Sequence, residues 1–364
     1  MDQDSVLFKV ENRIGWLRLN RPRVLNSLNG EMLHAICDKL REWRDDAEVA
    51  LVLISGEGGK AFCAGGDMRS LYDLKDLNVK ETAYDFFLTE YVSDYMIHCY
   101  KKPILVYMDG IVMGGGVGLA IGASHRIVTE NTKWAMPEMN IGFYPDVGAS
   151  YFLNQMPGLT GRYLALTSDV MKAPDVAFAG AADYVLSSLD WPTLKSEMLF
   201  WNWEGDNVAS NLTSLIKKHA EPVRQESSSL AAAQDQISKH FAKESVEEIL
   251  SSLEKAANGG DRWAEHVRNT LASKSPVSLK VTLRQLQQGE RLSLADCFKM
   301  ELALSMNFME NPDFYEGVRS VLVDKDRSPR WRYSRLEEVD DEMVRSFFQW
   351  KYGDRSGLAL FDQP

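Results

Sequence analysis

Two acidic residues stand in apolar, glycine-marked surroundings within the stretch MPEMNIGFYPDVG, residues 136–148. Glu138 and Asp146 each follow a proline and lie eight residues apart. Either residue alone also fits a helix start, where an acidic side chain caps free amides or favours the positive end of the helix. Two carboxyls in one poorly solvated pocket have their pKa values pushed apart, so that one serves as base or nucleophile while the other keeps a proton. A bend at Gly142 and Pro145 would let both reach one cavity, where we expect acid-base or nucleophilic chemistry.

Two glycine-rich loops, FCAGGDM and MGGGVGLA, each follow an expected strand and lead into an expected helix. Glycine lets the main chain approach a ligand closely, and amides at a helix start have no partner within the helix. One amide from each loop would form an oxyanion hole for a tetrahedral intermediate or an enolate, and one such donor lowers a barrier by about 3 to 4 kcal/mol. Tight turns and close helix packing explain either loop alone. A dinucleotide fingerprint is excluded, because Ile121 stands where G-x-G-x-x-G needs its third glycine.

The overall composition is that of a globular protein that does not bind nucleic acid. The 364 residues can bury a sizeable core, and the formal net charge of −11 repels a phosphate backbone. Asp109 and several glycines interrupt the longest apolar runs, so we expect no membrane span. The four cysteines form no C-x-x-C pair and the six histidines no H-E-x-x-H motif, so we expect no metal site. The acidic N-terminus has no leader-like pattern, which leads us to expect a cytoplasmic location.

Strands and helices alternate along the first half of the chain, which is typical of an α/β fold with parallel strands. Alternating apolar and polar residues predict a hairpin, and apolar residues at helical spacing predict the first helix. The expected strands are 6–12, 15–21, 50–55, 103–110 and 125–130, and the expected helices are 31–43, 80–100 and 114–123. From about Trp191 onward the segments are helix-like. We therefore expect a core of residues 1–190 and a mainly helical region of residues 191–364 that packs on it.

Taken together, the motifs resemble a known family. The segments AFCAGGDM, GGGVGLA and MPEMNIGFYPDVG, in this order, are similar to the crotonase (enoyl-CoA hydratase/isomerase) superfamily. The C-terminal segment DFYEGVRSVLVDKDRSPRW resembles the 3-hydroxyisobutyryl-CoA hydrolase branch, as do SPVSLKVTLRQL and ESVEEIL. The resemblance covers nearly the whole chain. It implies an α/β fold with a core of ββα turns wound into a spiral and a mostly helical C-terminal region.

The resemblance also implies roles for individual residues. The amides of Gly66 and Gly115 would hold the carbonyl oxygen of an acyl-CoA thioester. Glu138 and Asp146 would be the catalytic pair, and Glu90 would line the substrate pocket. Glu138 would be either a nucleophile or the base that activates water, and Asp146 either the partner that keeps a proton or the group that binds the acyl hydroxyl.

Coenzyme A would be bound as part of the substrate, so no separate cofactor is implied. Its adenine end would lie against the loops RPRVLN and KAFCAGG, which assigns Arg23, Val24, Ala64 and Gly65 to CoA binding. Superfamily members commonly form trimers or paired trimers, but the C-terminal part is rearranged in this branch. The oligomeric state therefore stays open.

The implied reaction is hydrolysis of 3-hydroxyisobutyryl-CoA, or of a similar short 3-hydroxyacyl-CoA, in valine breakdown. The hydratases of the superfamily use two glutamates around one water, and this chain has Gly118 where they carry the first of them. Hydration is therefore disfavoured. An enoyl-CoA isomerase remains an alternative, because such enzymes use one glutamate at the position of Glu138. A non-catalytic acyl-CoA-binding or RNA-associated relative is a third possibility, since one fold hosts unrelated functions.

Overall fold

The fold is that of a computed structural model, which describes residues 4–75, 79–222, 227–353 and 356–362. The chain begins with the expected hairpin of β1 (Val6–Glu11) and β2 (Ile14–Leu19), paired antiparallel. Asn12 and Arg13 between them have φ of 48° and 59°. Two successive residues with positive φ suit the type I′ turn, whose twist matches that of the two strands.

Two sheets form the centre of the molecule. The larger has six strands in the order β1-β2-β3-β5-β7-β9, with every pair after the hairpin parallel. The smaller has three parallel strands in the order β4-β6-β8. The remaining strands are β3 (Leu51–Gly56), β4 (Ala61–Cys63), β5 (Ile104–Met108), β6 (Ile111–Met113), β7 (His125–Val128), β8 (Lys133–Ala135) and β9 (Tyr184–Val185).

Strands along the chain alternate between the two sheets, and this alternation builds the spiral. Strands β3, β5 and β7 enter the large sheet, and each is followed at once by β4, β6 or β8 in the small one. A helical segment then leads to the next pair. The expected spiral of ββα turns is therefore confirmed. The three strands of the small sheet were not predicted, because three residues are too few for a recognisable alternation.

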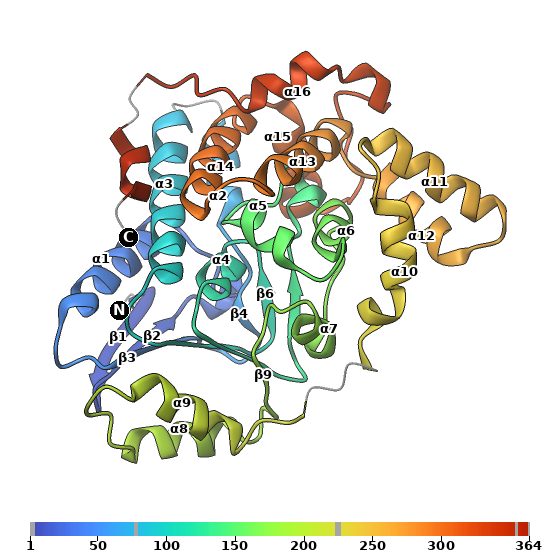
Figure 1. The fold of residues 1–364 in the computed structure, drawn as a ribbon. Coiled ribbons are helices and arrows are strands. Elements are labelled where there is room, and N and C mark those ends of the chain that lie inside the picture. The colour runs from blue at the N-terminus through green and yellow to red at the C-terminus, as the bar shows by residue number, and fades with distance from the viewer. Residues whose placement is uncertain (1–3, 76–78, 223–226, 354–355, 363–364) are drawn as a thin grey trace.

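The helices of the first half match the expected positions and add several short ones. They are η1 (Pro22–Val24), α1 (Gly30–Asp45), α2 (Met68–Asp73), α3 (Val79–His98), α4 (Gly115–Ile121), η2 (Glu138–Ile141), α5 (Ala149–Phe152), η3 (Leu153–Gln155), α6 (Thr160–Thr167) and α7 (Ala173–Phe178), where η marks a 3-10 or π helix. Helices α1, α3 and α4 cover one face of the large sheet (Figure 1).

From Trp191 onward the regular elements in the described part of the chain are helices. They are α8 (Trp191–Phe200), α9 (Val208–Lys217), α10 (Ser229–Phe241), α11 (Val246–Asn258), α12 (Arg262–Ala272), α13 (Pro276–Gly289), α14 (Leu294–Phe308), α15 (Pro312–Val318), η5 (Arg319–Val323), η6 (Leu336–Glu338), α16 (Asp341–Phe347) and η7 (Ser356–Asp362).

These helices pack on opposite sides of the core. Helices α8 and α9 lie under the large sheet, and α13 to α16 lie above it beside α3 (Figure 1). Leu53 and Leu105 of the sheet share one buried cluster with Leu194 and Leu212 of α8 and α9. A second cluster runs without a break from the spiral into the upper helices. The boundary at residue 190 therefore stays a prediction, since the hydrophobic core crosses it.

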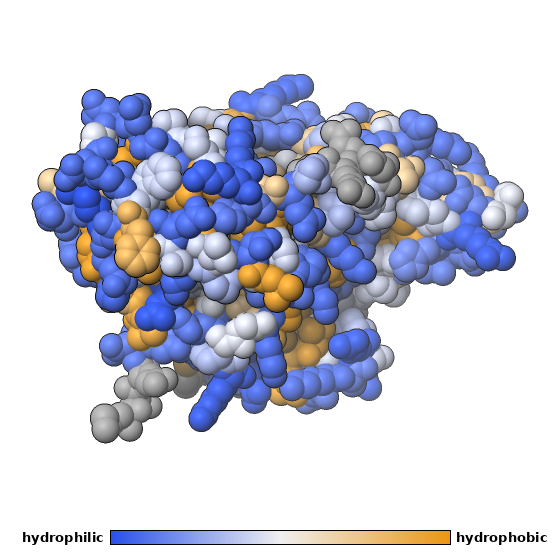
Figure 2. Space-filling model, turned by 90° about the horizontal axis from the view of Figure 1, so that it is seen from below, coloured by the Kyte–Doolittle hydropathy of each residue, from blue (hydrophilic) through white to orange (hydrophobic). Residues whose placement is uncertain are grey.

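The surface beneath the sheet is mostly hydrophilic. Figure 2 views the molecule from the side of α8 and α9 and shows apolar residues as separate patches among polar ones. Within the ranges that the structure describes, no helix combines the length and the hydropathy needed to cross a bilayer.

Candidate active site

The small sheet places three loops side by side. Strand β4 ends at Cys63, β6 at Met113 and β8 at Ala135. The two glycine loops and the Pro137-Glu138 segment follow these strands directly. Because parallel strands present their carboxyl ends at one edge, the three loops meet there. The sheet that sequence patterns miss is thus the element that assembles the predicted site residues.

The two glycine loops are in direct contact. A Cβ added to Gly115 would lie 3.3 Å from the main-chain nitrogen of Gly66, and one added to Gly65 would lie 3.5 Å from that of Gly115. Gly65 and Gly114 have φ of 100° and 52°, which favours glycine at both turns. No acceptor in the described parts of the chain pairs with the amides of Gly66 or Gly115. The pair is therefore free to donate to one ligand oxygen.

A cavity of about 290 Å³ is lined by both of these glycines. Gly66, Gly115, Glu90, Glu138 and Asp146 all line it, so the structure brings the five residues proposed for the acyl end together. A cavity of this size suits a small acyl group. No lysine or arginine is among the described residues that line it.

The four residues assigned to CoA divide into two groups. Ala64 and Gly65 line the cavity. Arg23 and Val24 lie in η1, outside the cavity lining, with exposed side chains. Main-chain hydrogen bonds of 2.9 to 3.0 Å nevertheless join residues 25–28 to Ala64 and Gly65. The role of these four residues in CoA binding stays a prediction.

The three carboxyls of the cavity are buried, with relative exposures of 1% for Glu90, 6% for Glu138 and 4% for Asp146. Burial raises the pKa of Glu90 and of Glu138 well above the usual range, and the charge of Asp146 raises both further. Burial also raises the pKa of Asp146, to about 7, but a hydrogen bond from Tyr91 opposes it. Asp146 therefore ionises first, which disagrees with one of its two expected roles, that of keeping a proton. The other expected role, binding the acyl hydroxyl, stays a prediction.

The carboxyls also differ in their partners. Glu90 Oε1 and Glu138 Oε2 are buried without a hydrogen-bond partner in the described structure. Asp146 Oδ2 instead accepts a 2.7 Å hydrogen bond from the Tyr91 hydroxyl. Buried polar atoms are usually paired, so an unpaired oxygen beside a cavity is a candidate for contact with a ligand. Glu138 thus has an oxygen available for chemistry, whereas Asp146 is anchored.

Glycines of α4 make room for three carboxyls in succession. An added Cβ would lie 2.7 Å from Glu138 Oε1 at Gly114, 2.2 Å from Glu90 Oε1 at Gly115 and 2.4 Å from Asp94 Oδ2 at Gly118. At each position the carboxyl would have to shift before a side chain could be admitted. The glycine run therefore has a second purpose besides the free amides, which is to admit acidic side chains from α3 and η2.

Sequence reasoning missed Asp94 and Glu301. Asp94 is fully buried one helical turn after Glu90, and both its carboxylate oxygens lack a partner in the described structure. Two acids four residues apart on an otherwise apolar helix face were a usable signal. Glu301 of α14 accepts hydrogen bonds from the amides of Gly148 (2.6 Å) and Ser150 (2.8 Å). It thereby fixes the turn after Asp146, and nothing local in the sequence marks it.

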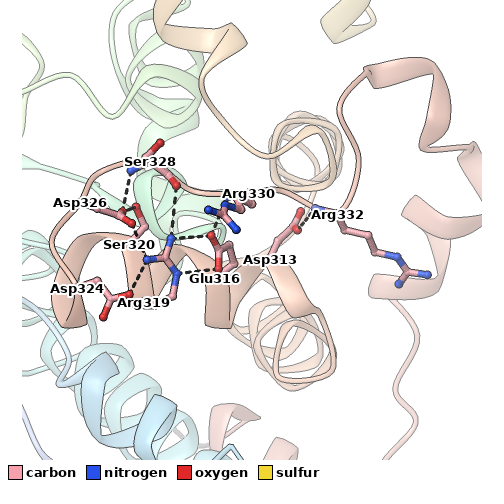
Figure 3. A network of polar contacts seen from close by, with 9 residues as sticks. All are labelled: Asp313, Glu316, Arg319, Ser320, Asp324, Asp326, Ser328, Arg330 and Arg332. Carbon is pink, nitrogen blue, oxygen red and sulfur yellow. Dashed lines mark hydrogen bonds and ion pairs between the residues drawn. The ribbon is translucent and has the colours of Figure 1, made fainter.

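The C-terminal region closes one wall of the cavity. Val321 and Leu322 of the π-helix η5 line it. Arg319, at the start of η5, holds this segment through Glu316, Asp324 and Asp326 at 2.7 to 2.9 Å, as Figure 3 shows. Single π-helical turns are rare and occur often at functional sites. The charged network therefore fixes the shape of the acyl pocket from outside.

The described residues hold no acidic, histidine or cysteine cluster suited to a metal ion.

Comparison with known proteins supports the family resemblance. A family model described as enoyl-CoA hydratase/isomerase matches residues 14–348. A protein of Xenopus tropicalis named "3-hydroxyisobutyryl-CoA hydrolase, mitochondrial" is 42% identical, with 92% of this chain and 86% of the relative covered. The Homo sapiens protein of the same name is 38% identical over 95% of this chain and 89% of its own length.

These names correct the expected location. The relatives are named as mitochondrial proteins, which contradicts the cytoplasmic location expected from the N-terminal sequence. The absence of a leader-like pattern was therefore a poor guide.

Solved structures agree with the fold. A carnitinyl-CoA dehydratase from Mycobacterium thermoresistibile has a TM-score of 0.87 at 32% identity, and an enoyl-CoA hydratase from Rhodobacter sphaeroides has 0.84 at 36%. Each comparison covers 95% of this chain and 97% of the other. With its spiral core, paired glycine loops and matching sequence over most of its length, the chain belongs to the enoyl-CoA hydratase/isomerase family.

Proposed function

We propose that this chain hydrolyses the thioester of 3-hydroxyisobutyryl-CoA, or of a similar short 3-hydroxyacyl-CoA, to CoA and the hydroxy acid. One observation carries the proposal: the unpaired amides of Gly66 and Gly115 belong to residues that line one cavity together with Glu138, which has an unpaired carboxyl oxygen. The names of the relatives support this substrate. We further propose that the reaction serves the breakdown of valine.

In the proposed reaction, Glu138 and Asp146 act as an acid-base pair that shares one proton. The ionised carboxylate takes a proton from water, whose oxygen attacks the carbonyl carbon. The amides of Gly66 and Gly115 stabilise the resulting oxyanion. The carbon–sulfur bond then breaks, and the thiolate takes a proton from the protonated carboxyl. Direct attack by Glu138, which would form a mixed anhydride that water then hydrolyses, is the alternative route.

A hydratase or isomerase acting on enoyl-CoA is the second candidate. Two relatives of known structure, named as a dehydratase and a hydratase, favour it. Against a hydratase stands Gly118, which gives α4 no carboxyl of its own, and against an isomerase stand the further cavity carboxyls of Glu90 and Asp146. The nearby Asp94 is buried outside the cavity lining.

A thiol-release assay separates these candidates. The purified protein is mixed with 3-hydroxyisobutyryl-CoA, and free CoA is followed with a thiol reagent, while a parallel reaction with an enoyl-CoA follows loss of the conjugated double bond. We expect thiol release, and we expect Glu138→Gln to lower its rate by about 10²- to 10⁴-fold. The matched control is Glu254→Gln on the exposed face of α11, which should leave the rate unchanged. Double-bond chemistry without thiol release would refute the hydrolase proposal.

A further inference from the structure

Asp146 is held by a buried chain of hydroxyl groups that comes from three parts of the fold. The Tyr91 hydroxyl of α3 lies 2.7 Å from Asp146 Oδ2 and 2.6 Å from Ser305 Oγ of α14. Ser305 Oγ also lies 2.7 Å from the Tyr144 hydroxyl. Tyr144 in turn donates to the main-chain carbonyl oxygen of Glu301 at 2.6 Å. All of these side chains are buried, so solvent does not compete for the bonds.

The direction of each bond follows from what its ends are able to donate. The carbonyl oxygen of Glu301 is only an acceptor, so the proton of Tyr144 points to it. An ionised Asp146 is likewise only an acceptor, so the proton of Tyr91 points to it. Ser305 lies between the two phenols and donates to one of them. Tyr91 therefore gives Asp146 its donor, and the Tyr91 oxygen also lies within hydrogen-bond distance of Ser305.

We propose that Tyr91, held by Ser305, is a positioning residue that keeps the shared negative charge of the active-site carboxyls on Asp146 and leaves the proton on Glu138. The proposal deepens the proposed hydrolytic function and rests on it for its catalytic meaning. It assigns the base to Asp146 and the acid to Glu138 in the free protein.

The surroundings of Asp146 support this assignment. The titratable groups that face it from the packed elements are acidic or phenolic: Glu90, Tyr91 and Asp94 on α3, Glu138 on η2, Tyr144 beside it in the chain and Glu301 on α14. The charge of Asp146 raises the pKa of each of these groups. One charge on Asp146 therefore disfavours a second charge on Glu138.

Asp146 has one donor more than Glu138. A main-chain hydrogen bond lowers the pKa of both, but only Asp146 also accepts a hydrogen bond from a side chain, whereas no hydrogen bond lowers the pKa of Glu90. One oxygen of Glu138 and one of Glu90 have no donor in the described structure. A hydrogen bond to the charged form of a carboxyl favours that form. Because the three acids share one cavity, the one with the side-chain donor takes the charge.

Carbon-13 NMR of carboxyl-labelled aspartate tests the proposal in the free protein. The Asp146 signal is assigned by its loss in Asp146→Asn, and its midpoint is measured in the unaltered chain, in Tyr91→Phe and in Tyr144→Phe. We expect Tyr91→Phe to raise the midpoint by about one pH unit, a tenfold change in the ratio of ionised to protonated Asp146. Tyr144→Phe removes an equally buried hydroxyl, which also contacts Ser305 but makes no hydrogen bond to Asp146. The midpoint of Asp146 should therefore stay in place in this variant.

A kinetic measurement then gives the catalytic meaning. The acidic limb of the pH profile of kcat/KM for thiol release should move by the same amount in Tyr91→Phe. In Tyr144→Phe this limb should not move. Ser305→Ala should move this limb in the same direction by a smaller amount. If Tyr91→Phe does not fold, Ser305→Ala serves as the test of the proposal in its place. Folded variants with unmoved midpoints, or equal shifts in Tyr91→Phe and Tyr144→Phe, would overturn the proposal. Because the NMR midpoint needs no substrate, failure of the hydrolytic function would show separately, as absence of thiol release by the unaltered chain.

Discussion

Gly115→Ala tests whether the glycine run clears space for the active-site acids. The added methyl would lie 2.2 Å from Glu90 Oε1 and 3.3 Å from both Glu90 Cδ and the nitrogen of Gly66. Ordinary contact begins near 3.4 Å. The Glu90 carboxyl or the helix start must therefore move by about 1 Å, and because Glu90 lines the cavity, its carboxyl has room to be displaced into it. The backbone at Gly115 is helical, so strain from a positive φ does not contribute.

The expected loss follows from that displacement. Moving a positioned group by about 1 Å can lower a rate 10²-fold, and losing one oxyanion donor lowers it about 10²- to 10³-fold. We therefore expect the kcat of thiol release to fall by about 10²- to 10³-fold. Overpacking should also lower the free energy of unfolding by about 1 to 3 kcal/mol, offset in part by the better helix propensity of alanine.

The assay pairs kinetics with stability. Thiol release and urea unfolding are measured for Gly115→Ala and for Gly30→Ala, a helical glycine whose added Cβ meets nothing within 4 Å. Gly30→Ala should keep full activity and equal or higher stability. Unaltered kcat in Gly115→Ala would refute the claim that this glycine clears the acyl site. Equal losses in both variants would refute it as well.

Three further predictions follow from the same geometry. A single turnover in H₂¹⁸O should place the label in the released hydroxy acid and none in Glu138, since the ionised partner activates water; label in Glu138 after that turnover, with unlabelled hydroxy acid released, would point to direct attack. The pKa of Asp146 is about 7 in the folded protein and 3.8 ordinarily, so the unfolded chain loses its proton first as pH rises. The free energy of unfolding should therefore fall by about 1 kcal/mol per unit between about pH 5 and 7, and a urea series should show Asp146→Asn flattening that slope. Arg319→Met should loosen η5 and raise KM more than it lowers kcat, whereas an unmoved KM would separate the charged network from the acyl pocket.

The parts of the fold that depend on local pattern were predictable. The hairpin at Asn12 and Arg13, the long α1 and α3, and the buried β5 each carry a signal within their own residues. Both glycine loops and both carboxyls of the 136–148 stretch were also visible, because glycine and acid are unusual in such apolar surroundings. The three strands of the small sheet were not, since tertiary pairing rather than pattern makes them strands.

The supporting groups of the site were hidden for a different reason. Ser305 and Glu301 lie more than 150 residues after Asp146 in the chain, and only the packing of α14 brings them to it. Tyr91 and Asp94 looked like ordinary members of a helix face. Arg23 and Val24 were assigned by resemblance, and the structure places them outside the lining of the cavity, with exposed side chains.

The measurement that tests the account most directly is a structure with a non-hydrolysable analogue of a 3-hydroxyacyl-CoA bound, in which a methylene group between the sulfur and the carbonyl turns the thioester into a ketone. The account predicts the acyl oxygen within about 3 Å of the amide nitrogens of both Gly66 and Gly115. The carboxyl groups of Glu138 and Asp146 should lie next to the carbonyl carbon. An acyl oxygen turned away from both amides, or an acyl group outside this cavity, would contradict the proposed hydrolysis.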